Sequence, residues 1–264
     1  MTIDRRPLSA QIGPVVDGRS LAIYRPLADG EFGFESTGFV LDLGNRALLV
    51  SAGHALQAER VGLIPHGVRS FWLRNKPVWD FDPTARDSVG DVGTVIIDPD
   101  ERSLLPPSCI TPLSALSTEP PTPQRRLYRV IGYREGEQVA DRVAGVYSNG
   151  ESVLSVSEAR PASYLHSRLA RSELLLLGAK RRNFRGPRGS GGIPSWKGMS
   201  GCPVWMVPTS GHPRLLSHPF ICGLLIGAPE HSRDLILTLR TEFLLRHIKR
   251  AYPAAGARVR AAAS

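Results

Sequence analysis

The chain has 264 residues and a formal net charge of +9, from 33 lysines and arginines against 24 aspartates and glutamates. A chain of this length can bury a substantial core in one large domain or two small ones. No apolar stretch approaches the roughly 18 residues that a membrane-spanning helix needs, so we expect no membrane span. Its 26 glycines, 22 prolines and many short apolar runs favour a turn-rich β protein over a helical one.

The N-terminal residues and the cysteines both predict a cytoplasmic protein. Residues 1–7 include two arginines, but no apolar segment follows them, as a secretory signal would require. The three cysteines are too few for a disulfide framework, which is typical of a reducing compartment. No cysteine and histidine spacing indicates a metal site, and we expect no metal and no cofactor.

Short apolar runs separated by turn signals predict the strands of the first half of the chain. After an irregular lead-in at residues 1–18, we expect a first β-barrel over residues 19–110. Its predicted strands are residues 21–24, 34–43, 46–50, 68–73 and 92–97.

The stretch from Pro106 to Pro123 is rich in proline, which is typical of a semi-extended connector between two halves. We place this connector at residues 111–126, and a second β-barrel with a C-terminal helix at residues 127–252. Its predicted strands are residues 127–133, 139–147, 152–156, 173–177, 202–207, 220–226 and 235–239.

The end of the chain predicts one amphipathic helix, over residues 241–250. Thr241 is the expected N-cap, because a threonine hydroxyl can accept a hydrogen bond from an amide of the first turn. Phe243, Leu244, His247 and Ile248 would form the buried face. The tail at residues 253–264 is expected to be disordered.

Three short motifs carry the candidate chemistry. Ser200 stands between glycines in Gly198-Met199-Ser200-Gly201-Cys202-Pro203, where a sharp turn can aim two amide groups at one point. His54 follows two apolar stretches joined by a Gly-Asn hairpin turn. Asp91 opens the apolar run at residues 92–97. A serine, a base and a carboxylate are the parts of a nucleophilic hydrolase.

In this order the three motifs resemble those of the trypsin-like (chymotrypsin-fold) serine peptidases. The resemblance implies an all-β fold of two six-stranded antiparallel β-barrels, with the active site in the cleft between them and a helix at the C-terminus. It also implies a serine endopeptidase with His54, Asp91 and Ser200 as the catalytic triad, and the N-terminal residues and cysteines predict that this endopeptidase is intracellular. The amides of Gly198 and Ser200 would form the oxyanion hole.

Two other aspartates compete with Asp91 for the third position of the triad. Asp87 lies in a polar stretch with no adjoining apolar run, and Asp98 lies in a Asp-Pro-Asp sequence typical of an exposed turn. Asp91 alone combines a preceding glycine with a buried strand that could hold a carboxylate in place. We therefore favour Asp91.

By the same resemblance, the substrate pocket would be lined by Pro194 and by Ile226, Gly227 and Ala228. No acidic residue lies between Glu173 and Ser200, so a carboxylate for a substrate lysine or arginine is missing from this segment. We expect cleavage after a small or aliphatic residue.

The chain departs from the family pattern at two positions beside the serine. Met199 replaces the aspartate that pairs with a newly freed N-terminus in the digestive enzymes, so activation by that route is not expected. Cys202 replaces a glycine and would face the core. A hairpin centred near His212 would set Cys202 opposite Cys222, and we expect both thiols to be reduced.

The excess positive charge leaves further partners and functions open. Residues 180–188 include five lysines and arginines and no acidic residue, and could bind an acidic protein activator or nucleic acid. The plainer interpretation is a solvated surface loop. The alternative to a peptidase is a catalytically silent β-barrel that binds protein or nucleic acid, because fold does not fix function.

Overall fold

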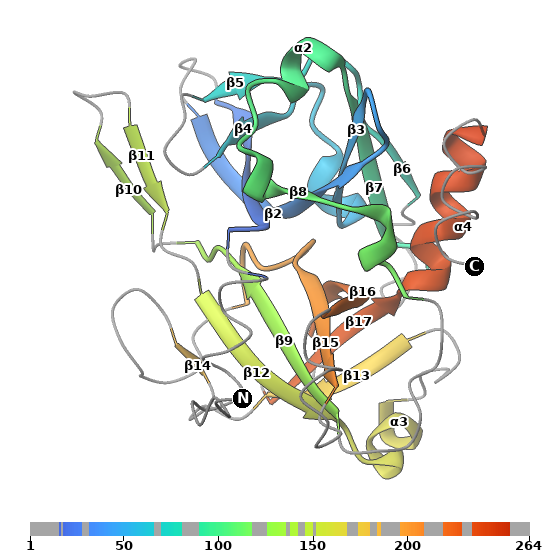
Figure 1. Ribbon diagram of the computed structural model, residues 1–264. Coiled ribbons are helices and arrows are strands. Elements are labelled where there is room, and N and C mark those ends of the chain that lie inside the picture. The colour runs from blue at the N-terminus through green and yellow to red at the C-terminus, as the bar shows by residue number, and fades with distance from the viewer. Residues whose placement is uncertain are drawn as a thin grey trace, which may run out of the picture.

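The computed structural model describes residues 16, 18–27, 32–65, 70–80, 90–117, 126–135, 138–141, 146–149, 152–167, 174–179, 184–185, 196–208, 219–228 and 234–253. In this part of the chain, strands dominate. They form two curved sheets, one above the other in Figure 1, and the C-terminal helix α4 runs beside the upper sheet.

The first sheet has the strand order β5-β4-β1-β2-β3-β7-β6, with β8 paired in parallel to β2. Successive side chains of its central strands point to opposite faces of the sheet. In the described residues its two end strands, β5 and β6, do not pair with each other, so the sheet is a curled half-barrel. Its strands are β1 (Ser20–Pro26), β2 (Phe32–Asp42), β3 (Ala47–Ser51), β4 (Gly62–Ile64), β5 (Phe71–Trp72), β6 (Val78–Asp80), β7 (Val92–Ile97) and β8 (Ile110–Thr111).

The second sheet closes on itself. Strand β13 pairs with β17 on one side and with β12 on the other, which completes a ring of six strands, β9-β12-β13-β17-β16-β15. A short strand, β14, lies outside the ring along β12. The members are β9 (Arg126–Gly132), β12 (Ser152–Glu158), β13 (Leu174–Gly178), β14 (Phe184–Arg185), β15 (Pro203–Pro208), β16 (Phe220–Gly227) and β17 (Leu235–Arg240).

The predicted fold class, two β units followed by a C-terminal helix, is confirmed, although only the second unit is a closed six-stranded barrel. Three strands of the first sheet, β4, β6 and β8, were not predicted, because two or three residues are too few to show an alternating pattern. The strand expected at residues 139–147 is instead a separate hairpin of β10 (Gln138–Asp141) and β11 (Val146–Asn149).

The beginning of the proline-rich stretch at residues 106–123 is more regular than expected. It contains two 3-10 turns, Pro107–Cys109 and Leu113–Ala115, with β8 between them. Leu116 forms a bridge to Ile221, and the amide of Ser117 donates to the carbonyl of Ile221 at 3.0 Å. The chain is therefore paired to the first sheet at residues 110–111 and to the second at residues 116–117, and β8 spans the expected boundary between residues 110 and 111.

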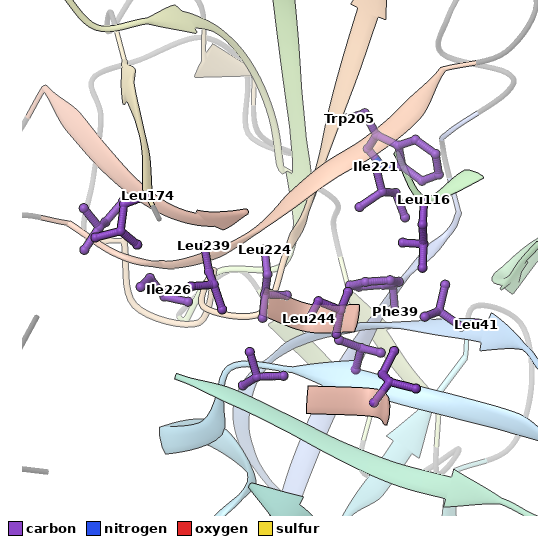
Figure 2. Packing of buried hydrophobic residues seen from close by; sticks show 14 of the residues in the cluster. Phe39, Leu41, Leu116, Leu174, Trp205, Ile221, Leu224, Ile226, Leu239 and Leu244 are labelled. Atoms are coloured by element: carbon purple, nitrogen blue, oxygen red, sulfur yellow. The ribbon is translucent and has the colours of Figure 1, made fainter. Parts of the chain in front are cut away.

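A buried cluster fixes the two sheets against each other. Phe39 and Leu41 from β2 pack in the same cluster as Trp205 and Ile221 of the second sheet, and all four are at most 2% exposed. Figure 2 shows these side chains meeting between the sheets, with Leu244 of α4 beside them. Removing apolar area of this size from water is the main stabilising contribution to the arrangement.

Helix α4 (Thr241–Ala251) follows the second sheet in the chain, packs on its strands β16 and β17, and also reaches β7 of the first sheet (Figure 1). His247 is 4% exposed, and its Nε2 lies 3.0 Å from Thr94 Oγ1 on β7. The predicted N-cap is one residue off, because the cap position is Arg240. Thr241 lies inside the helix, and its hydroxyl donates to the carbonyl of Ile221 at 3.1 Å.

None of the helices in the described ranges is both long and apolar enough to cross a membrane. None of the cysteines Cys109, Cys202 and Cys222 is in a disulfide. The predicted pairing of Cys202 with Cys222 is wrong: Pro203 lies opposite Leu224, and a bulge follows at residues 204–205. The amide of Leu225 therefore donates to the carbonyl of Cys202, at 2.9 Å.

Candidate active site

The register of β3 and β7 brings His54 and Asp91 together. The two strands are antiparallel, with Ser51 opposite Gly93, so the end of β3 and the beginning of β7 lie at the same edge of the sheet. His54 lies in a 3-10 turn, Gly53–Leu56, which starts two residues after β3. Asp91 comes immediately before β7. The hairpin and strand patterns in the sequence thus place both residues at one edge.

Asp91 holds His54 by two hydrogen bonds. His54 Nδ1 lies 2.7 Å from Asp91 Oδ2, and the backbone amide of His54 donates to Asp91 Oδ1 at 2.9 Å. Because an ionised carboxylate can only accept, Nδ1 carries the proton and Nε2 is the nitrogen that can accept one. Asp91 is 6% exposed, whereas the His54 side chain is 36% exposed. The arrangement fixes the tautomer while leaving part of the ring accessible.

The electrostatic surroundings of His54 favour its protonated form. Burial alone lowers the pKa of His54, but the hydrogen bond and charge of Asp91 and the charge of Glu35 outweigh it, so the pKa lies above the ordinary 6.5. An imidazole with a raised pKa is a stronger base once it has lost its proton. Glu35 is part of this balance although no motif includes it.

Ser200 lies in a tight turn that is closed by its own backbone. The amide of Met199 donates to the carbonyl of Trp196 at 3.0 Å, and that of Cys202 to the carbonyl of Met199 at 3.1 Å. Gly198 and Gly201 have φ angles of 87° and 86°, a region that a residue with a Cβ rarely adopts. The glycines on both sides of the serine are thus required by the backbone path.

This turn docks on the first sheet beside the strand that leads to His54. The amide of Thr37 donates to the carbonyl of Ser200 at 3.2 Å. A Cβ on Gly201 would overlap Ser51 Oγ and the carbonyl oxygen of Thr37. Ser51 is the last residue of β3, three positions before His54. The structure therefore brings the serine turn of the second barrel against the edge of the first sheet that carries His54.

Two carbonyls of the turn are held in a way that orients the amides of Gly198 and Ser200. The amide of Glu135 donates to the carbonyl of Lys197 at 3.0 Å, and that of Cys202 to the carbonyl of Met199. In a planar trans peptide, the N–H points opposite to the C=O. Within the described ranges, neither the Gly198 amide nor the Ser200 amide has a hydrogen-bond acceptor. Both can therefore donate to a ligand.

The expected wall of the substrate pocket begins beside this turn. The amide of Gly201 donates to the carbonyl of Leu225 at 2.7 Å, and Ile226, Gly227 and Ala228 follow directly at the end of β16. A Cβ on Gly227 would meet no heavy atom within 4 Å, so the space beside this residue is open. Pro194, the other predicted pocket residue, lies outside the described residues.

The residues that depart from the family pattern lie in the core. Met199 and Cys202 are both 0% exposed and belong to the apolar cluster inside the second barrel. The expectation that Cys202 faces the core is confirmed. A Cβ on Gly132 would overlap Cys202 Sγ, so β9 approaches this side chain closely.

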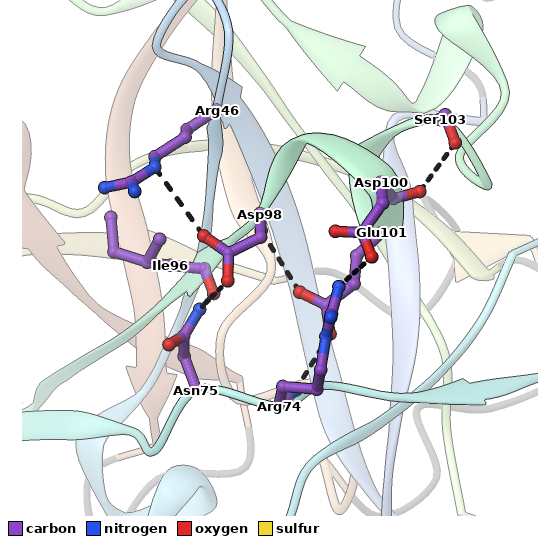
Figure 3. A network of polar contacts seen from close by, with 8 residues as sticks. All are labelled: Arg46, Arg74, Asn75, Ile96, Asp98, Asp100, Glu101 and Ser103. Carbon is purple, nitrogen blue, oxygen red and sulfur yellow. Dashed lines mark hydrogen bonds and ion pairs between the residues drawn. The ribbon is translucent and has the colours of Figure 1, made fainter.

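Of the two competing aspartates, Asp98 has a structural role far from His54. It lies at the other end of β7, where it forms a capping box with Glu101 at the start of α2 (Pro99–Arg102). Asn75 Nδ2 donates to its Oδ2 at 3.0 Å, and Figure 3 shows this network joining three loops. Asp87 lies outside the described residues.

Three contacts of the site involve residues that no sequence motif singles out. Thr37 of β2 forms hydrogen bonds with the serine turn, Ser51 of β3 lies against Gly201, and the Phe34 ring occupies the space that a Cβ on Gly198 would need. The contribution of such residues to the site can be recognised only once the pairing of strands distant in sequence is known. The sole signal for Ser51 is its position in the Ser-Ala-Gly-His stretch.

The basic segment at residues 180–188 lies almost wholly outside the described residues. Only the backbone of Phe184 and Arg185 is described, and it pairs with β12. The hypothesis that an acidic protein or nucleic acid binds this segment therefore remains a prediction.

Comparison with known proteins identifies the fold but no close relative. No protein-family model matches the sequence, and no curated protein is significantly similar to it. A solved structure described as "Structure of GrC" superimposes with a TM-score of 0.57 and 14% sequence identity, covering 91% of this chain and 96% of that one. Neuropsin, described as a serine protease expressed in the limbic system of mouse brain, gives a TM-score of 0.57 and 9% identity, covering 90% and 96%. The chain has the chymotrypsin-like fold.

Proposed function

We propose that this protein is a serine endopeptidase that uses Ser200 as nucleophile, His54 as general base and Asp91 to orient the base. One observation carries the proposal: both oxygens of a buried carboxylate hold His54, at the sheet edge where the Ser200 turn docks. A carboxylate that only formed an ion pair with a histidine could do so through one oxygen. Two bonds to one histidine fix both the ring and its backbone, which is what a general base requires.

In the proposed reaction, His54 Nε2 takes the proton of Ser200 as Oγ attacks the carbonyl carbon of the substrate peptide bond. The resulting oxyanion accepts hydrogen bonds from the amides of Gly198 and Ser200. His54 then gives its proton to the leaving amine, and the C–N bond breaks to leave an acyl ester on Ser200. Water repeats the sequence, with His54 again as base, and releases the acid.

The substrate is a protein or peptide, and we propose that the residue before the cleaved bond is small or aliphatic. Ile226, Gly227 and Ala228 carry no charge, and the described part of β16 offers no carboxylate to a basic side chain. Burying a lysine or arginine there without a partner would be costly. A peptide library profile dominated by lysine or arginine before the cut would contradict this specificity.

A fluorophosphonate probe tests the function directly, because it phosphonylates only an activated serine. We expect wild-type protein to be labelled stoichiometrically and Ser200→Ala to be unlabelled, with peptide turnover lost in parallel. Ser103→Ala is the matched control, because Ser103 is exposed and only donates to the carbonyl of Asp100. A folded wild-type protein that is neither labelled nor active on peptides would favour the catalytically silent binding module instead.

We also propose an intracellular location. The chain carries three cysteines that form no disulfide, two of them buried, and the cytoplasm keeps thiols reduced. Alkylation of freshly lysed cells, followed by mass spectrometry, should find all three cysteines modified as thiols. A disulfide recovered in that experiment would contradict both the redox state and the compartment.

A further inference from the structure

Thr37 occupies a junction between the two sheets and the serine turn. It lies in β2 and is 0% exposed. Its hydroxyl donates to the carbonyl of Gly198 at 2.8 Å, and the amide of Tyr133 donates to that hydroxyl at 2.9 Å. A single side-chain oxygen thus joins β2, the segment after β9, and the turn that carries Ser200.

The backbone of Thr37 adds two further bonds at the same place. Its amide donates to the carbonyl of Ser200 at 3.2 Å, and its carbonyl accepts from Ser51 Oγ at 2.7 Å. Ser51 ends the strand that leads to His54. Thr37 is therefore bonded both to the turn that carries the proposed nucleophile and to the strand that leads to the proposed base.

The proton of the hydroxyl has one favoured acceptor. A threonine hydroxyl donates once and accepts up to twice. The Tyr133 amide occupies one lone pair, and the carbonyl of Gly198, at 2.8 Å, is closer than that of Tyr133, at 3.2 Å. The bonds form a chain, from the Tyr133 amide through the Thr37 hydroxyl to the Gly198 carbonyl, in which each bond polarises the next.

Holding the Gly198 carbonyl matters because glycine is the most mobile residue of the turn. Gly198 has a positive φ and no Cβ to restrict it, so its two flanking peptides can rotate at low steric cost. Glu135 holds the peptide before Gly198, and the Thr37 hydroxyl holds the one after it. Together the two bonds keep the Gly198 amide aimed at the place where an oxyanion would form.

We propose that the Thr37 side chain is a positioning residue: its hydroxyl fixes the peptide between Gly198 and Met199, and so restricts the backbone of Gly198, whose own amide is one of the two donors to the oxyanion. The proposal rests on the proposed function, because it assigns a role within that reaction. Thr37 touches neither substrate nor reacting atoms, and acts only through Gly198. Its contribution is greatest in the transition state, where the charge on the oxyanion is largest.

Three variants separate this role from ordinary support of the fold. Thr37→Val keeps the shape and removes the hydroxyl, whereas Thr37→Ser keeps the hydroxyl. Thr241→Val is the matched control: Thr241 is also 0% exposed and also donates to one backbone carbonyl, that of Ile221 at the other end of β16. Each variant is measured for fluorophosphonate labelling rate, kcat, KM and melting temperature, alongside wild type.

We expect Thr37→Val to lower kcat and the labelling rate by about 10- to 100-fold with little change in KM, because misaligning an oxyanion donor affects the transition state more than substrate binding. Thr37→Ser should stay close to wild type. Thr241→Val should lose stability to a degree similar to Thr37→Val while keeping its activity. If Thr37→Val is unfolded at the assay temperature, Thr37→Cys replaces it, and its weakly donating thiol should give an intermediate rate.

Three outcomes would overturn the proposal. If wild type is labelled but Thr37→Val reacts as fast as Thr37→Ser and Thr241→Val, the hydroxyl does not position Gly198, while the serine peptidase function stands. If Thr37→Val raises KM and leaves kcat unchanged, the residue supports substrate binding instead. A wild-type protein that is not labelled at all would remove the proposed function and this role with it.

Discussion

Substituting Asp91 by asparagine tests the proposed triad most sharply, because the change is nearly isosteric. The carboxylate accepts two hydrogen bonds from His54, one from Nδ1 and one from the backbone amide. An asparagine offers one accepting oxygen and one donating NH₂ group. If its oxygen keeps the backbone bond, its NH₂ group faces Nδ1, which must then give up its proton. The ring is driven into the tautomer whose Nε2 already carries a proton and cannot act as base.

The expected loss of activity is large and that of stability is small. In enzymes that use this arrangement, the wrong tautomer lowers kcat by about 10⁴-fold. The stability cost should be about 2 kcal/mol, because hydrogen bonds to a buried charged group are worth roughly 1.5–3 kcal/mol and one of the two is retained. Fluorophosphonate labelling and peptide turnover measure the first effect, and thermal unfolding measures the second.

Asp98→Asn provides the control for the same chemical change on the same strand. Asp98 lies at the opposite end of β7 and caps α2, so this variant should be slightly less stable and fully active. If Asp91→Asn retained turnover within about tenfold of wild type, the orienting role of Asp91 would be wrong. Equal activity of the two variants would likewise show that the pair of bonds to His54 has no catalytic consequence.

Three further predictions follow from the same contacts. Activity should fall as pH decreases, with a midpoint above 6.5 because His54 must be neutral to act as base; Glu35→Gln should move that midpoint down, since the Glu35 charge raises the pKa of His54. An upward or absent shift in the pH–rate profile would count against this effect. Gly201→Ala should abolish labelling, because its Cβ would overlap Ser51 and Thr37, whereas Gly18→Ala, also at positive φ but with nothing within 4 Å, should only lower the melting temperature slightly. Finally, burial lowers the pKa of His247, so the unfolded chain binds a proton more readily and this residue should reduce stability as pH falls below 6.5. His54, with its raised pKa, has the opposite effect: it contributes stability below pH 6.5 that is lost as pH rises. Comparing wild type with His247→Gln isolates the contribution of His247, because His54 is present in both. Equal slopes of melting temperature against pH would refute the role of His247.

The local sequence determined much of the fold because strand patterns are short-range. The predicted strand at residues 92–97 is β7 itself, and those around residues 34–43 and 46–50 differ from β2 and β3 by a few residues. Apolar runs ended by glycine, proline or asparagine leave the backbone few alternatives. The sequence also indicated which residues could react, because the spacing of a serine turn, a histidine and an aspartate is itself informative.

The tertiary structure decided what depends on pairing between distant segments. Short strands such as β4 and β6 are stable only through pairing with neighbouring strands, so their own residues do not predict them. The register of β15 and β16, which contains a bulge, sets Pro203 opposite Leu224, so Cys202 does not lie opposite Cys222. The closure of the second barrel and the curl of the first sheet depend in the same way on which edges meet.

The candidate site shows the same division between sequence and structure. His54, Asp91 and Ser200 were singled out by motif, because the proposed chemistry requires a particular residue type at each position. Thr37 and Ser51 were not, since a threonine or a serine in a strand has no distinctive spacing, and the Thr37 hydroxyl meets the Gly198 carbonyl across 161 positions of sequence. A hydrogen bond between such distant residues depends on how the two sheets pack. That packing depends on residues throughout the chain, so no single stretch of sequence predicts the bond.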